Sequence, residues 1–257
     1  MTNQTLAELE QQVLARPWFY EFKLPSGKTT PTYGEGRFNA IHDTRQRMID
    51  DALTHRMNGE VDGKTVIDLA CNQGYFSAQM AARGAASIHG IDARQEHIDD
   101  ALLIHRAMGY NNFSAEVCDI EDVSKERFGQ FDIVLMLGLI YHLENPVGAI
   151  RRAHALTRDV CFIETQVVPG MNGYVDWGSH DFVRPLMGSF GILDETDEVH
   201  ATEASTLGIC LAPNIEGLMW IMKAVGFDRV ELLHPRPGDY EQHLYRKRVM
   251  VAGYVDE

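Results

Sequence analysis

Short apolar runs rich in β-branched residues alternate with amphipathic segments along the chain after residue 60. This alternation is typical of a parallel sheet whose strands are joined by helices. The last apolar run follows the sixth without room for a crossover helix, so we expect these two strands to pair antiparallel. The sequence therefore predicts an α/β fold with a mostly parallel seven-stranded sheet and an antiparallel last strand, the strands lying at 65–70, 87–92, 113–119, 131–138, 160–168, 229–235 and 248–255.

Two of the expected helices carry clear end signals. Asn145 can cap the first, and Pro146 then takes the first helical position, where a missing N–H costs nothing. Asn214 can cap the second, and Gly226 is placed to end it. A further helix is expected at about 42–57.

Two regions interrupt the alternation. Residues 1–60 are rich in aromatic residues and glycine, and we interpret them as an N-terminal cap that serves as a substrate lid. Residues 169–212 form a long insertion before the sixth strand, and insertions of this size in a compact domain are usually functional. We therefore expect a main domain at 61–257 that carries this insertion.

Composition narrows the class of protein. No run of about eighteen apolar residues occurs, and the N-terminus is too polar for a signal peptide, so we expect a cytoplasmic protein. The formal net charge of -14 disfavours nucleic acid as a partner. The cysteines form no C-x-x-C pair, so we expect no metal site and small buried roles for Cys71, Cys118, Cys161 and Cys210.

The stretch VIDLACNQGYFSAQMA reads as a buried strand, a turn and the start of a helix. A turn that binds a dinucleotide would carry the pattern G-x-G-x-x-G, but here Ala70 and Asn72 stand where glycines are expected and only Gly74 remains. A ligand without phosphates needs fewer glycines, because no anion has to lie against several backbone N–H groups. Asp68 would also repel a pyrophosphate and favour a cationic group such as an ammonium.

Two more carboxylates follow at the ends of the next strands. Asp92 lies eighteen residues beyond Gly74, at the position of the carboxylate that binds ribose hydroxyls in this class of fold. Asp119 ends the third strand and could accept a hydrogen bond from an adenine amino group, while the backbone of Ile120 meets the ring edge. Together the three carboxylates favour a site for a ribose and an amine over a phosphate site.

With these motifs the sequence resembles the class I S-adenosylmethionine-dependent methyltransferases. The resemblance spans about 65–168 and rests on VIDLACNQGYFS, IHGIDA, EVCDIED, FDIVLMLGLIYHLENPVGAIRRAHAL and CFIETQ. The turn and the G-x-x-Y-H-L-x-N-P segment are similar to the branch that contains tRNA wobble-uridine oxyacetate methyltransferases and related small-molecule enzymes. The resemblance implies a Rossmann-like seven-stranded sheet, S-adenosylmethionine bound across its carboxyl edge, and direct methyl transfer.

The resemblance also assigns positions to the cofactor. By position, Asp68, Cys71, Asn72 and Gly74 would surround the methionine part, Asp92 and Ala93 the ribose, Asp119 and Ile120 the adenine, and Leu137 and Gly138 would close the pocket. Simpler roles stay open for several of these residues. Asp68 and Asp92 could be capping residues, Asp119 part of a solvated acidic turn, Cys71 a packing residue and Gly74 a close-packing glycine.

Methyl transfer from a sulfonium is an in-line displacement, so alignment and exclusion of water can supply most of the catalysis. His142, directly after the fourth strand, is the best candidate for a general base, with a second role as a structural histidine left open. Tyr141 is a candidate acid or pocket wall, and Glu164 could bond the acceptor or a cap residue. Arg45, on the expected cap helix, could reach the methionine carboxylate or be solvated.

The acceptor is the least defined part of the prediction. Aromatic residues in the cap and in the insertion could line one acceptor pocket, namely Trp18, Phe19, Tyr20, Tyr33, Tyr174, Trp177, His180 and Phe182. The basic run Arg246, Lys247 and Arg248 is interpreted as a solvated face. We therefore favour a small-molecule acceptor, for which an aromatic compound is one option, over tRNA, with a non-catalytic cofactor-binding protein as a third hypothesis. An exposed cap helix could also form a homodimer.

Overall fold

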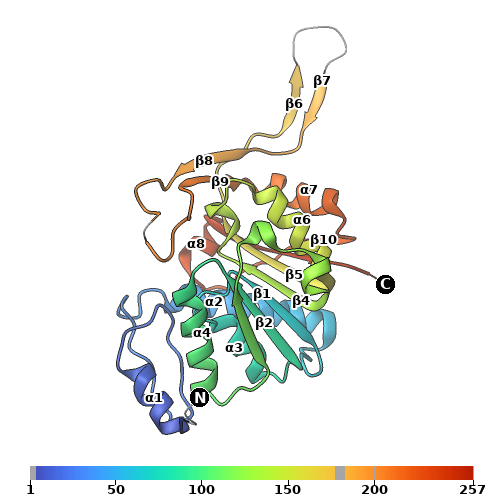
Figure 1. Cartoon of the computed structure of the whole chain (residues 1–257). Helices are drawn as coiled ribbons and strands as arrows, with labels where there is room; N and C mark the ends of the chain where they lie inside the picture. Colours follow the sequence, from blue (N-terminus) through green and yellow to red (C-terminus); the bar gives the residue numbers. More distant parts are fainter. Residues whose placement is uncertain (1–3, 177–182, 200, 257) are drawn as a thin grey trace.

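A computed structural model describes residues 4–176, 183–199 and 201–256. Its central sheet has the strand order β10-β11-β5-β4-β1-β2-β3 (Figure 1). All neighbouring strands are parallel except β11, which runs antiparallel to both β5 and β10. The predicted Rossmann-like sheet is confirmed, with the strands β1 (Thr65–Leu69), β2 (Ser87–Asp92), β3 (Phe113–Val117), β4 (Phe131–Leu137), β5 (Thr157–Gln166), β10 (Arg229–Leu232) and β11 (Arg248–Tyr254).

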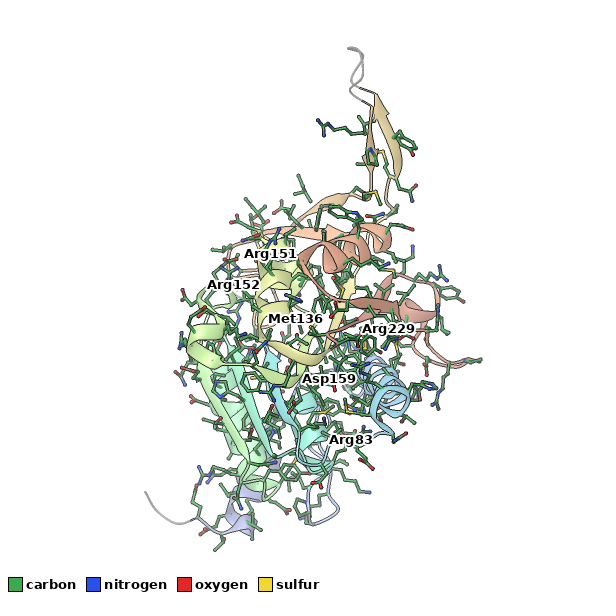
Figure 2. All side chains as sticks on the ribbon, turned by 90° about the vertical axis from the view of Figure 1, so that its right-hand side faces the viewer. Arg83, Met136, Arg151, Arg152, Asp159 and Arg229 are labelled. Carbon is green, nitrogen blue, oxygen red and sulfur yellow. The ribbon has the colours of Figure 1, made fainter. Side chains whose placement is uncertain are left out.

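Helices cover both faces of this sheet, because alternate residues of each central strand point to opposite sides. Leu135 of β4 belongs to the core beneath one set of helices, and Met136, labelled in Figure 2, belongs to the core on the other face. The first core is completed by α2 (Asn39–Met57), α3 (Tyr75–Ala82) and α4 (Gln95–Ala107), and the second by α6 (Pro146–Leu156) and α7 (Ile215–Val225).

The two predicted helix starts are confirmed at the level of single atoms. The side chain of Asn145 accepts a hydrogen bond from Gly148 N at 2.9 Å, and Pro146 opens α6. Asn214 accepts from Gly217 N at 3.2 Å, and Gly226 ends α7 with φ 128. The fifth strand begins earlier than expected, because β5 starts at Thr157 directly after the last residue of α6.

The N-terminal region packs on the sheet domain through several contacts. Helix α1 (Leu6–Leu14) lies against α4, and the Arg16 guanidinium pairs with the Asp100 carboxylate. Helix α2 begins three residues before the predicted start, at Asn39, and buries Ile49 and Leu53 completely. The N-terminal segment and the sheet therefore share one hydrophobic core.

The long connection between β5 and α7 forms two antiparallel hairpins. One pairs β6 (Gly173–Asp176) with β7 (Val183–Leu186), and Figure 1 shows it projecting away from the rest of the molecule. The other pairs β8 (Phe190–Asp194) with β9 (Ile209–Pro213) and lies against the turn that follows β4, where Leu211 N donates to Leu143 O at 3.0 Å. One hairpin thus borders the carboxyl edge of the sheet, while the other extends from it.

The remaining helices are short: α5 (Lys125–Phe128), α8 (Glu241–Leu244), and the 3-10 turns η1 (Ile120–Asp122) and η2 (Ile140–His142). No helix within the described residues is long and apolar enough to span a membrane. All four cysteines are free and buried, as expected from their spacing.

Candidate active site

A cavity lies at the carboxyl ends of β1, β2 and β4, beside the segment that follows β3. Ligands of open α/β sheets bind at this edge. Its wall includes predicted site residues from four separate stretches of chain, together with a segment of the insertion, namely Asn72, Asp92, Ala93, Asp119, Ile120, Gly138, His142 and residues 202–206.

The turn after β1 keeps a glycine-like backbone without glycines. Ala70 has φ 67 and Asn72 has φ 47, which is the left-handed region that L-residues other than Asn and Asp rarely adopt. This conformation turns Asn72 N towards β2, where it donates to Asp92 Oδ2 at 3.0 Å. Ala70 and Asn72 therefore adopt the backbone conformation that glycine favours, although neither is a glycine.

Gly74, at the start of α3, packs tightly against α4. It has φ 76, and a Cβ at this position would lie 2.8 Å from His105 Cε1 and 3.0 Å from the Ala101 Cβ. Gly74 is not one of the described residues that line the cavity. The close-packing role considered for this glycine is therefore present in the structure.

Asp68 and Cys71 lie beneath the turn and do not line the cavity. The Asp68 carboxylate is 2% exposed and accepts from Ser77 Oγ at 2.7 Å. Burial raises the pKa of Asp68 to about 7, and the negative charge of nearby Asp92 adds to this increase. Cys71 fills the space under Gly90, where a Cβ would lie 2.8 Å from its sulfur.

Asp92 presents a carboxylate that the backbone holds in place. Its two oxygens accept from Asn72 N, from Arg94 N at 3.0 Å, and from His97 Nδ1 at 3.0 Å. An ionised carboxylate has about four acceptor sites, so one remains for a ligand hydroxyl. The residue is 8% exposed and borders the cavity.

Asp119 and Ile120 form the wall on the β3 side. Asp119 Oδ1 accepts from Glu121 N at 2.9 Å and thereby caps η1. Its Oδ2 has no hydrogen-bond partner among the described residues. Asp119 therefore caps η1 with one oxygen, and its other oxygen can still accept a hydrogen bond from a ligand.

Gly138 ends β4 at the floor of the cavity. It has φ 74, and its N–H donates to the carbonyl of Glu164 at 2.9 Å. A Cβ here would lie 3.5 Å from Arg45 Nη2. Leu137 is buried and does not line the cavity, so of the two predicted residues only Gly138 borders it.

Behind Gly138 lies a buried ionic cluster of Arg45, Tyr141, Glu164 and Arg248. Arg45 Nη2 lies 2.7 Å from Glu164 Oε2, and Arg248 Nη1 lies 3.3 Å from Glu164 Oε1. Burial alone would raise the pKa of Glu164, but the two guanidinium groups outweigh it and lower this pKa. Arg248 Nη2 also donates to the Tyr141 hydroxyl at 2.9 Å. None of these four residues lines the cavity.

Arg248 corrects one prediction. The basic run was interpreted as a solvated face, but Arg248 is 8% exposed and lies in the cluster, whereas Arg246 and Lys247 are exposed. The pairing of Arg248 with Gln166 in the β11–β5 register brings its side chain next to Glu164. The sequence could not show this, because the register of two strands depends on packing across the sheet.

His142 borders the cavity and is held by a residue of the insertion. Its Nδ1 lies 2.8 Å from Glu195 Oε2, and the same oxygen accepts from Ser205 N at 2.8 Å. Burial lowers the pKa of His142 below its ordinary value, although Glu195 acts in the opposite direction. Glu195 was not predicted, because no sequence pattern links it to a histidine 53 residues away.

A segment of the insertion closes one side of the cavity. Arg94 Nη2 donates to the carbonyls of Ala201 at 2.9 Å and Ala204 at 3.0 Å. The Tyr33 hydroxyl also bonds the Glu203 carboxylate. Residues from the N-terminal region, from the sheet and from the insertion therefore meet at this wall.

Among the described residues, the predicted aromatic pocket does not form as one unit. Trp18 is completely buried, and Tyr20 stacks on Tyr75 with 5.0 Å between the ring centroids. Tyr174 is 79% exposed on the projecting hairpin. Aromatic residues of the cap pack into the core because burying them removes a large apolar area from water. Trp177, His180 and Phe182 lie outside the described residues.

His142, Glu195 and Cys210 bring a nitrogen, an oxygen and a sulfur atom within 4.8 Å of one another, a set that could hold a metal ion. Hydrogen bonds already account for the contact between His142 and Glu195 and for the one between Glu195 and Ser205. The geometry therefore suits an oriented histidine without requiring an ion.

Sequence comparisons match the part of the chain that builds this cavity. A family described as "Methyltransferase domain" matches residues 60–172. A ubiquinone biosynthesis O-methyltransferase from Neisseria meningitidis is 27% identical over 123 residues, which cover 48% of this chain and 50% of that protein. A tRNA U34 carboxymethyltransferase from Campylobacter lari is 24% identical over 198 residues, 76% of this chain and 59% of that protein. The chain thus spans about half the length of curated relatives that it matches.

Solved structures share the fold. The N-terminal domain of EvdMO1, crystallised in the presence of SAH and D-fucose, aligns with a TM-score of 0.69 and 20% identity over 98% of both chains. Magnesium protoporphyrin IX methyltransferase from Synechocystis, with bound SAM, aligns with a TM-score of 0.53 and 15% identity over 85% of this chain and 83% of that one. The cyclase SpnF aligns with a TM-score of 0.52 and 16% identity over 89% of this chain and 71% of that one.

Proposed function

Residues 60–172 belong to the class I S-adenosylmethionine-dependent methyltransferases, and on this premise we propose that the protein transfers a methyl group from S-adenosylmethionine to a small-molecule acceptor. The observation that carries the proposal is the cavity at the carboxyl edge, which is lined by Asp92, Asp119 and Gly138 from three separate segments. Its location is the ligand edge of this fold.

The residues at this edge fit the cofactor. Ala70 and Asn72 of the left-handed turn line the cavity, and Asp92 keeps an acceptor site for a ribose hydroxyl. The free Oδ2 of Asp119 is available to an adenine amino group. Arg45 lies behind Gly138, and its buried Nε has no hydrogen-bond partner among the described residues, so we propose this guanidinium for the methionine carboxylate.

The proposed chemistry needs little from the protein besides alignment. S-adenosylmethionine supplies a methyl group bound to a positively charged sulfur, and an acceptor placed in line can displace it. The Nδ1–H of His142 donates a hydrogen bond to the Glu195 carboxylate. Nε2 is then unprotonated and free to take a proton from an acceptor hydroxyl or ammonium. Because burial lowers the His142 pKa, the imidazole stays neutral at physiological pH and can act as this base.

The remaining expectations follow from this function. We propose that residues 1–60 act as a cap, that 61–257 form the catalytic domain, and that the insertion at 169–212 contributes to acceptor binding. Tyr141 and Glu164 shape the acceptor side through the buried cluster. We further propose a cytoplasmic location. The molecular mass of the protein in solution would show whether it forms the homodimer that the sequence suggested.

Two other functions compete with this proposal. A tRNA acceptor is favoured by the Campylobacter relative, whose similarity extends over 76% of this chain. A net charge of -14 argues against it, because phosphate binding requires a basic surface. The other competing function is that of a cofactor-binding protein that transfers no methyl group. The fold permits this, since SpnF, described as a cyclase, shares it.

Calorimetric titration with S-adenosylmethionine, S-adenosylhomocysteine and NAD tests the cofactor. We expect saturable binding of the first two and none of NAD, and the reverse result would contradict the proposal. A radiolabelled-methyl assay against total tRNA and against a metabolite extract then tests the acceptor. Label in the extract is the expected outcome, label only in RNA would favour the tRNA function, and cofactor binding without label would favour the third function.

A further inference from the structure

The side chain of His97 contacts the carboxylate that is proposed to bind the cofactor ribose. Asp92 ends β2, and His97 lies in the first turn of α4, five residues further along the chain. Both residues are buried, and both line the cavity. Among the described residues, His97 and His142 are the histidines that border this cavity.

The hydrogen bonds to Asp92 occupy its two oxygens unequally. Oδ1 accepts from Arg94 N at 3.0 Å, and His97 Nδ1 lies 3.0 Å from the same oxygen. Within the described residues, Oδ2 accepts from Asn72 N alone, at 3.0 Å. Each carboxylate oxygen has about two acceptor sites, so Oδ1 is filled and Oδ2 keeps one. A ligand hydroxyl is therefore directed to Oδ2.

The contact with Asp92 is the one polar contact of the His97 side chain in the described part of the chain. An ionised carboxylate can only accept hydrogen bonds, so Nδ1 carries the proton in this contact. A hydrogen bond to an ionised group is roughly twice as strong as one between neutral groups. The bond therefore fixes the plane of the Asp92 carboxylate, whose last torsion has a broad range in the absence of such bonds.

His89 forms an equivalent bond away from the cavity. It lies three residues before Asp92 in β2, and its Nδ1 is 2.9 Å from Ser114 Oγ. His89 is not one of the described residues that line the cavity. Loss of its bond should affect the stability of the fold and not the binding of a ligand at Asp92, so His89 provides a matched comparison for His97.

We propose that His97 is a positioning residue for the cofactor ribose. By occupying Oδ1 of Asp92, it presents Oδ2 to a ribose hydroxyl in one fixed orientation. His97 acts through Asp92 and needs no contact with the cofactor itself. The inference rests on the proposed function, because it takes the ligand at this edge to be S-adenosylmethionine.

The affinities of the full chain for adenosine and for 2′,3′-dideoxyadenosine test the inference. These nucleosides differ only in the two ribose hydroxyls, and displacement of S-adenosylhomocysteine in calorimetry gives both dissociation constants. The unaltered chain should bind adenosine about tenfold more tightly. His97→Phe, which keeps a ring and removes the donor, should reduce this ratio to about threefold or less. His97→Asn, whose amide N–H can replace the Nδ1–H, should keep the ratio near that of the unaltered chain.

The control variant is His89→Leu, which should leave the ratio unchanged. A ratio near one in the unaltered chain, or an unchanged ratio in His97→Phe, would overturn the inference. Equal falls in His97→Phe and His97→Asn, or an equal fall in His89→Leu, would do the same, because the donor to Asp92 would then not decide the binding. His97→Leu removes the donor with a smaller side chain and replaces His97→Phe if that variant does not fold. Failure of S-adenosylhomocysteine binding in the unaltered chain would instead refute the proposed function.

Discussion

At the scale of single residues, the contact between His142 and Glu195 links the insertion to the cavity. We predict that Glu195→Gln lowers kcat about 10- to 100-fold, because the imidazole loses the carboxylate that fixes its tautomer. Since Glu195 opposes the lowering of the His142 pKa, its removal should also move the acid limb of the kcat/KM profile to lower pH. Steady-state kinetics across pH 5 to 9 measures both effects.

A suitable control for Glu195→Gln is Asp197→Asn, which removes an exposed carboxylate two residues away. It should leave kcat and the pH profile unchanged. If both variants lost activity with the same pH profile as the unaltered chain, Glu195 would support only the folding of the insertion.

Ala70 is the second residue with a specific prediction. Its left-handed backbone costs an alanine about 1–2 kcal/mol, whereas glycine adopts this conformation freely and loses somewhat more entropy on folding. We therefore predict that Ala70→Gly raises the free energy of unfolding by about 0.5–1 kcal/mol, measured by urea denaturation. Ala155→Gly in the right-handed helix α6 should lower it by about 1 kcal/mol, and stabilisation by both changes would rule out the conformational reason.

At the scale of elements, the sequence predicted what local patterns determine. The helix caps at Asn145 and Asn214 and the antiparallel last strand were predictable from residue type and spacing. The two hairpins of the insertion were not, because their pairing joins strands whose register local sequence does not specify. The burial of Arg248 was missed for the same reason.

Asn214 carries an element-scale prediction, because it caps α7 and also holds the loop before β8. Its Oδ1 accepts from Gly217 N and from Ser189 N at 2.8 Å. Asn145 caps α6 through a single bond. Asn145→Ala should cost about 1 kcal/mol of stability, and Asn214→Ala about 2–3 kcal/mol, since it also leaves Ser189 N unpaired. Equal losses in chemical denaturation would show that the bond to Ser189 contributes nothing.

At the scale of the whole molecule, Asp68 makes global stability depend on pH. Its folded pKa of about 7 lies above the ordinary 3.8, so the folded state binds more protons between these values. Stability from this group is complete below about pH 4 and is lost as pH rises through 7. Between pH 5 and pH 8 the unaltered chain should lose on the order of 3 kcal/mol more than Asp68→Asn.

The comparison with Asp68→Asn is needed because other groups titrate in the same range. Burial lowers the pKa of His42 to about 3, so this residue stabilises the fold above its ordinary pKa of 6.5 and loses that contribution as pH falls. The difference between the two proteins cancels this term. Urea denaturation at a series of pH values measures the difference in the free energy of unfolding between the unaltered chain and Asp68→Asn. If this difference did not change with pH, Asp68 would be ionised in the folded state.

The sites draw on the whole chain, which explains why sequence patterns found only part of them. Strand ends predicted which residues meet at the edge of the sheet, because parallel strands bring their last residues together. The bonds from Arg94 to Ala201 and from His142 to Glu195 join segments that no periodicity relates. The cofactor and catalytic roles of these residues stay predictions until binding and activity are measured.

The antiparallel direction of β11 has a consequence for how such proteins diverge. It keeps the connection from β10, residues 233–247, at the same edge as the insertion after β5. Both segments can lengthen or change without disturbing any strand of the sheet. The matched region, residues 60–172, stops where the first of these segments begins. The acceptor side of the proposed site can therefore differ through two connections while the strands that carry the cofactor residues stay the same.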